Sequence, residues 1–295
     1  MLKIALPNKG RLADDARELF ADAGLEVRAR GERALTASLG GEFEALFVRA
    51  QDIPEFVADG AADAGVTGWD LVSEAERALD VLLDLEFGRC RMVVAAKDDS
   101  GVATLDDVAD GARVATVFPR VTRAFFARAG RRVEVVPVSG AVEVAPHLGI
   151  ADVVVDITST GSTLKVNGLR EIETVLESSA RLVVAQGVAQ MAGGDKRRAL
   201  DELVAALASV LRARGKRYLM ANVPRAALDR VKEVLPGLNG PTVIDILNGS
   251  GDPHASAHVA VHAVVPANAI YRTIAQLKAL GGEGILVTRI ERLMP

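Results

Sequence analysis

The stretch Gly149-Ile-Ala-Asp-Val-Val-Val-Asp-Ile-Thr-Ser-Thr-Gly-Ser-Thr-Leu164 decides the fold class. Its centre, Val153 to Ile157, is apolar except for Asp156 and has the length of a strand. A loop of serine and threonine residues around Gly161 follows, and a helix is expected to start near Ser162. A buried strand that leads through a polar loop into a helix is typical of an α/β protein.

The same alternation of strands and helices continues along the chain. Leu2 to Leu6 predicts a strand, and the apolar residues after it recur at helical spacing up to Gly24. Strands separated by helices predict parallel pairing. The segment Gly60 to Gly68 also resembles Gly149 to Asp156. Two similar α/β lobes that face each other would produce such a sequence similarity, and so would chance. The other expected strands are Ala64–Val66, Met92–Ala96, Arg113–Val117 and Val133–Pro137.

A separate pattern follows a break expected at Gln190 to Gly194. Asp195 is expected to cap a helix that ends at Gly215. The order after it, strand, helix, two strands, helix and strand, is the βαββαβ pattern of ferredoxin-like domains. The expected elements are strand Tyr218–Val223, helix Ala226–Leu235, strands Thr242–Leu247 and Ala257–Val265, helix Asn268–Leu280 and strand Gly284–Ile290.

Length and composition exclude several classes of protein. The chain has 295 residues, enough for two or three domains, and a formal net charge of -4 with scattered basic residues, which indicates no nucleic-acid surface. It has no apolar run of membrane-spanning length, and its short apolar start before Pro7 does not fit a secretion signal. Cys90, the one cysteine, excludes an internal disulfide and is expected to be a buried, inert thiol. We expect a cytoplasmic protein that acts neither on membranes nor on nucleic acid.

The loop after Val153–Ile157 suits a phosphate group. Gly161 allows close approach of the backbone, successive N–H groups can converge on an oxyanion, and the hydroxyl groups add donors. Asp156 can accept hydrogen bonds from sugar hydroxyls or help to hold Mg²⁺. The alternative is a polar turn in which a serine or threonine caps a helix.

Three ordered motifs resemble those of the ATP phosphoribosyltransferase family. The first is Glu143, then Gly149, Ala151, Val154, Asp156-Ile157 and Thr160-Gly-Ser-Thr-Leu164. The others are Leu6-Pro-Asn-Lys-Gly-Arg-Leu12 and Gly65-Val-Thr-Gly68. The likeness covers essentially the whole chain, and the last module resembles the regulatory domain of the long form. It implies two periplasmic-binding-protein-like α/β lobes that form a cleft (1–94 with 182–213, and 95–181) and a ferredoxin-like domain (214–295).

This resemblance implies a site and a reaction. Adenine N1 of ATP would displace pyrophosphate from phosphoribosyl pyrophosphate (PRPP). Mg²⁺ would be carried by the substrate phosphates, and the resemblance does not identify which protein residue binds it. It also implies inhibition by L-histidine and a homo-oligomer, from a dimer to a hexamer. The implied catalytic residues are Asp156 and Glu143, the PRPP-binding residues Asp156, Thr158, Ser159, Thr160, Gly161, Ser162 and Thr163, and the anion- or ATP-binding residues Lys9, Arg11, Thr67 and Gly68.

Other interpretations of these residues stay open. Lys9 and Arg11 also fit a solvated helix start, Thr67-Gly68 a simple turn, and Glu143 a charge that favours a helix dipole after a cap by Ser139 or Gly140. A two-lobed cytoplasmic binding protein without catalysis, or a phosphoribosyltransferase for another base, would have similar loops. The histidines His254, His258 and His262 are four residues apart, but they fall on a turn and a strand, which favours sheet side chains over metal ligands.

Overall fold

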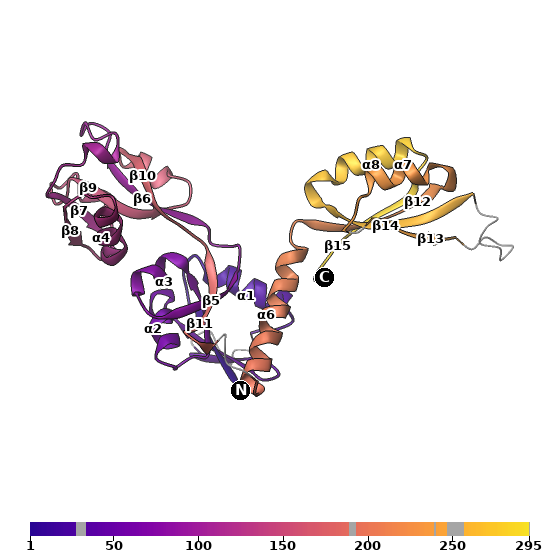
Figure 1. Ribbon diagram of the computed structural model, residues 1–295, viewed down its shortest axis with the longest axis horizontal. Helices are drawn as coiled ribbons and strands as arrows, with labels where there is room; N and C mark the ends of the chain where they lie inside the picture. The colour runs from indigo at the N-terminus through magenta and orange to yellow at the C-terminus, as the bar shows by residue number, and fades with distance from the viewer. Residues whose placement is uncertain (28–33, 189–192, 239, 247–256, 295) are drawn as a thin grey trace. The chain divides into compact units, whose positions relative to one another are not determined.

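The computed structural model describes residues 1–27, 34–188, 193–238, 240–246 and 257–294. The chain forms two compact units, Met1–Ala208 and Ser209–Pro295, drawn in Figure 1. The break expected at Gln190 to Gly194 falls largely outside the described residues. The helix expected after it is present as α6 (Asp195–Ala213).

The first sheet of the first unit is built on a central buried strand, β1 (Leu2–Pro7), as predicted. It has six strands in the order β2-β3-β1-β4-β11-β5, and β1 is parallel to both of its neighbours. Ile53, Val57 and Val72 bring two short helices onto one face of it. The other elements are β2 (Thr36–Gly40), β3 (Phe43–Val48), β4 (Ala64–Gly68), β5 (Leu79–Asp84) and β11 (Ala180–Ala185), with α1 (Ala13–Asp22), η1 (Ala50–Asp52), α2 (Ile53–Ala58) and α3 (Trp69–Ala75).

The second sheet has five strands in the order β10-β6-β9-β7-β8. Its core includes Met92, Val114, Phe126 and Val155, each almost fully buried. The expected strands and the helix start at Ser162 are confirmed. The elements are β6 (Cys90–Lys97), β7 (Ala112–Thr116), β8 (Val133–Pro137), β9 (Val153–Thr158) and β10 (Leu169–Ser178), with η2 (Leu105–Asp107), α4 (Pro119–Arg128), η3 (Val142–Val144) and α5 (Ser162–Val166).

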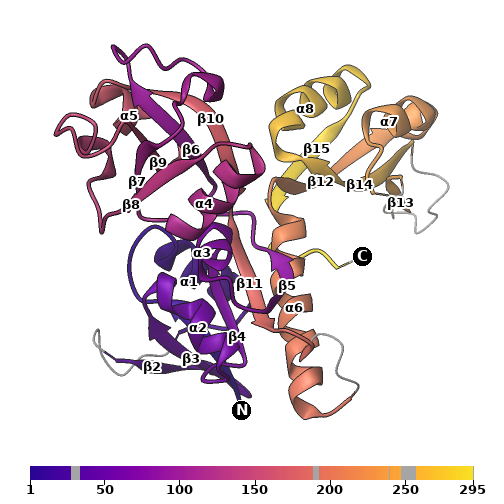
Figure 2. The ribbon, with the colours of Figure 1, turned by 60° about the vertical axis from the view of Figure 1, so that its left-hand side comes forward.

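The chain passes between the two sheets twice, from β5 to β6 and from β10 back to β11 (Figure 2). All of β6 belongs to the second sheet, so the expected lobe boundary between residues 94 and 95 falls inside this strand. On the return, residue 179 alone separates β10 from β11.

The two sheets repeat one arrangement around the similar segments 60–68 and 149–156. In the first, Asp63 N–H donates to the Lys3 carbonyl and Lys3 N–H donates to the Asp63 carboxylate, each at 2.8 Å. In the second, Asp152 and Arg113 exchange the same two bonds, at 2.9 and 2.8 Å. Each segment then enters a strand with a parallel neighbour on one side and an antiparallel one on the other. The sequence similarity thus corresponds to equivalent places in two similar α/β lobes.

The expectation of parallel pairing is wrong for part of each sheet. The strand predicted at Met92–Ala96 pairs antiparallel with both β9 and β10. The physical reason is the way the chain connects these strands. It enters the second sheet at β6 directly from β5 of the first sheet, and β10 later runs back beside β6. Parallel pairing needs a crossover within one sheet, and such pairs occur for β7 with β8 and β9.

The second unit has the predicted βαββαβ order in a four-stranded antiparallel sheet, β13-β14-β12-β15. Its core joins the sheet to two helices through Leu219, Val231, Val261 and Leu277. The elements are β12 (Lys216–Pro224), η5 (Arg225–Ala227), α7 (Leu228–Val234), β13 (Thr242–Asp245), β14 (His258–Pro266), η7 (Ala267–Ala269), α8 (Ile270–Ala279) and β15 (Glu283–Arg289). Each expected helix here begins with a 3-10 turn, and Leu247 and His254 lie outside the described residues.

Candidate functional site

The hydroxyl-rich loop leaves the carboxyl end of β9 and makes its turn at Gly161. This glycine has φ +76°, a left-handed conformation that suits a residue without Cβ. Its N–H donates to Thr158 Oγ1 at 2.8 Å, and Thr158 is buried. The hydroxyl groups of Thr160 and Ser162 lie 2.9 Å apart, and Ser159, Thr160, Ser162 and Thr163 are exposed. One buried hydroxyl therefore shapes the loop, and the other hydroxyl residues remain exposed to solvent.

Asp156 is the carboxylate immediately before this loop. The pKa of Asp156 is raised to about 6, mainly by burial; the Ile157 N–H that it accepts at 2.8 Å acts in the opposite direction, and the nearby Glu143 carboxylate adds a smaller upward contribution. A carboxylate held in such surroundings is costly to ionise and gains from a positively charged neighbour.

Glu143 lies in η3, where the expected capping is wrong. The residue before the turn is Ala141, and no side chain caps it. Ala141 has φ +50°, a left-handed conformation that is unfavourable for a residue with Cβ. The backbone therefore carries strain two residues from Glu143, and strain of this kind is concentrated at functional sites.

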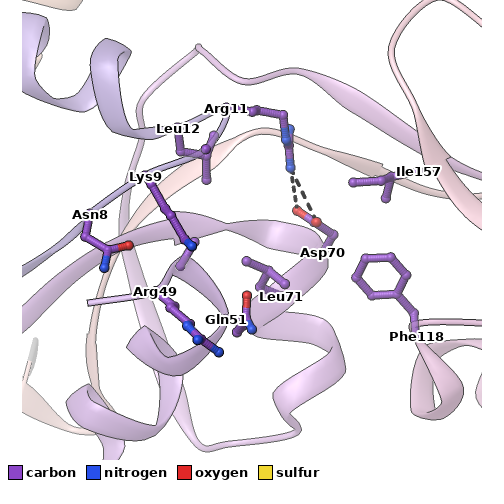
Figure 3. Close-up of a pocket in the computed structure, with 12 residues that line it drawn as sticks. Asn8, Lys9, Arg11, Leu12, Arg49, Gln51, Asp70, Leu71, Phe118 and Ile157 are labelled. Carbon is purple, nitrogen blue, oxygen red and sulfur yellow. Dashed lines mark hydrogen bonds and ion pairs between the residues drawn. The ribbon is translucent and has the colours of Figure 1, made fainter. Parts of the chain in front are cut away.

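A cavity of about 590 Å³ lies beside the end of β9 and brings the N-terminal loop into the site. Ile157 and Phe118 line it from the second sheet, and Lys9 and Arg49 line it from the carboxyl ends of the parallel strands β1 and β3. Figure 3 shows the Lys9 and Arg49 side chains among those that line the cavity. Within the described ranges neither of these side chains has a hydrogen-bond or ion-pair partner, so both charges are available to an anion.

Arg11 also lines the cavity, but its guanidinium is engaged. It pairs with Asp70 at 3.4 Å, donates to Cys90 Sγ at 3.2 Å and bonds to the Gly88 carbonyl. Asp70 is 1% exposed and also accepts from the Ser178 hydroxyl at 2.6 Å. Arg11 thus ties the N-terminal loop to α3 through the Asp70 pair drawn in Figure 3, and to the segment that crosses between the sheets through Gly88 and Cys90.

Thr67 and Gly68 lie behind the cavity wall. Both are buried, and the Thr67 hydroxyl donates to the Ala50 carbonyl at 2.7 Å, which fixes the turn that carries Arg49. A Cβ on Gly68 would lie 2.2 Å from Asp70 Oδ1, so this position has no room for a larger residue. The structure therefore places these two residues against cavity-lining segments and not at the cavity surface.

A contact between the lobes is made by Glu74 of α3. Its carboxylate accepts from the backbone N–H groups of Arg120 at 3.0 Å and Val121 at 3.0 Å, in the first turn of α4. Arg120 in return donates to the Ala75 carbonyl at 2.9 Å. Glu74 therefore supplies the cap and the negative charge that the amino end of a helix favours, from the opposite lobe.

Arg49 is the site residue that sequence reasoning missed. It follows β3 directly, a strand that the pattern analysis did not assign, at the edge where Pro7 to Gly10 leaves β1. A basic residue at the carboxyl end of a second parallel strand was the signal that could have identified it.

Two of the three histidines spaced four apart, and the cysteine, lie among the described residues; His254 does not. His258 and His262 lie on one face of β14, and no group of three or more His, Cys, Asp or Glu side chains able to hold a metal occurs among the described residues. Cys90 is 6% exposed, and burial raises the pKa of its thiol. No helix among the described residues is long and apolar enough to cross a membrane.

Comparison with known proteins assigns the chain to a family. Residues 49–209 match the family described as HisG, ATP phosphoribosyltransferase, and residues 213–292 match the HisG C-terminal domain. The ATP phosphoribosyltransferase of Gemmatimonas aurantiaca is 72% identical over 300 residues, covering 100% of both chains. That of Haloarcula marismortui is 49% identical over 99% of this chain and 100% of its own.

A solved structure agrees with this assignment. The ATP phosphoribosyl transferase (HisG:HisZ) complex from Thermotoga maritima superposes with a TM-score of 0.61 at 29% identity, covering 70% of this chain and 97% of the other. The chain therefore belongs to the ATP phosphoribosyltransferase family, the enzymes of the first step of histidine biosynthesis.

Proposed function

We propose that Asp156 and the loop from Thr158 to Thr163 bind PRPP, and that adenine N1 of ATP attacks its anomeric carbon. The observation that carries this proposal is a half-buried carboxylate at the end of β9, beside a cavity with two available cations. The N1 lone pair forms the new C–N bond, and the electron pair of the broken C–O bond leaves with pyrophosphate. The products are N1-(5-phosphoribosyl)-ATP and pyrophosphate.

The loop and Asp156 bind different parts of PRPP. The exposed hydroxyl groups of Ser159, Thr160, Ser162 and Thr163 suit the 5′-phosphate. Asp156 accepts hydrogen bonds from the ribose and stabilises the positive charge that develops on the ring as pyrophosphate leaves. Adenine N1 is a weak nucleophile, so holding both substrates in line supplies much of the acceleration.

Lys9 and Arg49 are the groups we assign to the pyrophosphate or triphosphate oxygens. Both reach the same cavity without a partner of their own among the residues described. Arg11 we assign to holding the loop that carries Lys9, because its guanidinium already contacts Asp70 and the crossing segment. Thr67 contributes by fixing the turn at Ala50, and Gly68 leaves room for Asp70.

Mg²⁺ fits this site as an ion carried by the substrates. The described residues contain no group of three or more ligating side chains, so a cage made by the protein alone is not built there. Mg²⁺ commonly binds through one or two carboxylates together with substrate phosphates. Asp156 and Glu143 are the carboxylates at this end of β9 that would hold it, and it would supply charge neutralisation for the leaving group.

The domain assignment and the regulation belong to the same proposal. We assign catalysis to the two lobes and inhibition by L-histidine to the ferredoxin-like domain at residues 214–295, in a cytoplasmic homo-oligomer between a dimer and a hexamer. The match of residues 213–292 to the HisG C-terminal domain supports this assignment. The loop Asn248 to Pro253, a candidate for the histidine pocket, lies outside the described residues.

The test is a direct assay of product absorbance with ATP, PRPP, Mg²⁺ and pyrophosphatase, with and without histidine. We expect turnover that histidine suppresses and that Asp156→Asn reduces at least about 100-fold. Asp152→Asn, immediately before the same strand and at the opposite end from the loop, is the matched control and should keep its activity.

The other outcomes discriminate between the alternatives. Turnover insensitive to histidine refutes only the regulatory assignment. Consumption of PRPP with a free base and not with ATP indicates a phosphoribosyltransferase for another base. Binding of ribose 5-phosphate without any turnover indicates a binding protein.

A further inference from the structure

An ion pair lies against the turn of the hydroxyl-rich loop. Arg91 of β6 donates to Glu171 of β10 through both terminal nitrogens, at 2.8 and 3.3 Å. The residue opposite Arg91 in the strand register is Glu177. The Arg91 guanidinium nevertheless pairs with Glu171, so the ion pair is not a consequence of strand register alone. On its other side Arg91 is the register partner of Thr158, the first hydroxyl residue of the loop.

Glu171 is pressed against the backbone of Gly161. A Cβ built on Gly161 would lie 2.6 Å from Glu171 Oε1, far inside normal contact distance. Gly161 is also the residue with φ +76° whose N–H is held by Thr158. The turning point of the loop therefore rests on a carboxylate that Arg91 holds in place.

A carboxylate in this position conflicts with the binding of a phosphate unless its charge is balanced. Glu171 is 28% exposed, so its negative charge is only partly screened by water. The bidentate pair with Arg91 neutralises that charge and fixes the plane of the carboxylate. The same pair thus supports the loop mechanically and removes a repulsion from it.

We propose that Arg91 and Glu171 are positioning residues for the phosphoribosyl loop: Glu171 supports the turn at Gly161, and Arg91 orients Glu171 and neutralises it. This inference rests on the proposed assignment of the loop to PRPP. Arg91 acts through Glu171 in this scheme and not as a ligand of the substrate. The scheme makes the effect of removing Arg91 depend on whether Glu171 is still charged.

The experiment is a double-mutant cycle in the full-length enzyme. Arg91→Met leaves an unbalanced carboxylate beside the loop, and we expect the KM for PRPP to rise about ten-fold, with kcat and the KM for ATP within about two-fold of wild type. Removing the charge as well, in Arg91→Met/Glu171→Gln, should restore the KM for PRPP to within about three-fold of wild type. Arg91→Lys should also retain most of the wild-type value. Glu173→Gln, on the same strand and exposed, is the control.

Two results overturn the inference. A double variant no better than Arg91→Met would show that Arg91 itself binds the substrate. Unchanged KM values with a lower Tm in every variant would show a pair that only stabilises the sheet. Calorimetric titration with ribose 5-phosphate measures the affinity of the same variants for the phosphate group without turnover. The role of the pair is therefore tested even if the proposed reaction is not observed.

Discussion

Asp156→Asn should make the protein more stable at pH 8 while removing its activity. Burial raises the pKa of Asp156 to about 6 from the ordinary value of 3.8. Between these two values the folded chain binds more protons than the unfolded chain, so stability falls as the pH rises through that window. Above pH 6 the cost of the buried charge is fully present. An asparagine carries no charge, and its side-chain oxygen can still accept the Ile157 N–H.

The magnitude follows from the two pKa values. A difference of about 2.2 units corresponds to about 3 kcal/mol at pH 8 and to about 1 kcal/mol at pH 4.5. For a unit of this size each kcal/mol shifts Tm by about 2 to 4 °C, so a rise of roughly 6 °C or more is expected at pH 8. Trp69, the single tryptophan, lies at the start of α3 and reports unfolding of the first unit by its fluorescence.

Asp152→Asn, at the residue just before β9, provides a control of opposite sign. The Arg113 N–H and guanidinium lower the pKa of Asp152, so its charge stabilises the folded state above the unfolded pKa and this contribution is lost as the pH falls. This variant should therefore be less stable than wild type at pH 8. The reasoning is refuted if Asp156→Asn is less stable than wild type at pH 8, or if its gain is the same at pH 4.5.

Three further predictions concern other parts of the first unit. Lys9→Gln should raise the KM for ATP or PRPP about ten-fold in the product assay, whereas Lys3→Gln should not; equal effects would refute the anion role of Lys9. Glu74→Ala should lower stability by about 1 kcal/mol through loss of the cap on α4, measured by urea unfolding against Glu18→Ala on an exposed helix face; no difference would refute the cap. Because burial raises the pKa of the Cys90 thiol, a thiol reagent at pH 8 should label folded protein at least about ten-fold more slowly than protein in urea, and equal rates would contradict its burial.

Local patterns predicted most of the elements because their signals are local. Val153, Val154 and Val155 are buried on a central strand, and the glycine and hydroxyl residues after that strand form the expected loop and helix start. The repeated segments around Asp63 and Asp152 could be aligned by sequence because each is one contiguous unit with the same backbone bonds.

Relations between distant segments could not be predicted in the same way. Nothing near Met92 indicates that its strand pairs antiparallel with both neighbours, because this is decided by how the chain enters the second sheet. The partners of Arg11 are also distant: Asp70 and Cys90 lie 59 and 79 residues away. Its charge and position at a helix start predicted an anion site, whereas the fold directs the guanidinium to a buried carboxylate.

The double passage of the chain between the sheets has a consequence for folding during synthesis. β11 lies between β4 and β5 in the first sheet, yet it is synthesised about a hundred residues after β5. At roughly 5 to 20 residues per second, β4 and β5 wait about 5 to 20 s on the ribosome with their facing edges unpaired. Unpaired edges are sites of aggregation, so the nascent first lobe depends on rapid completion or on protection by chaperones until Ala180 to Ala185 emerges. A stable fragment of that lobe must accordingly include β11, joined across the gap left by the second sheet.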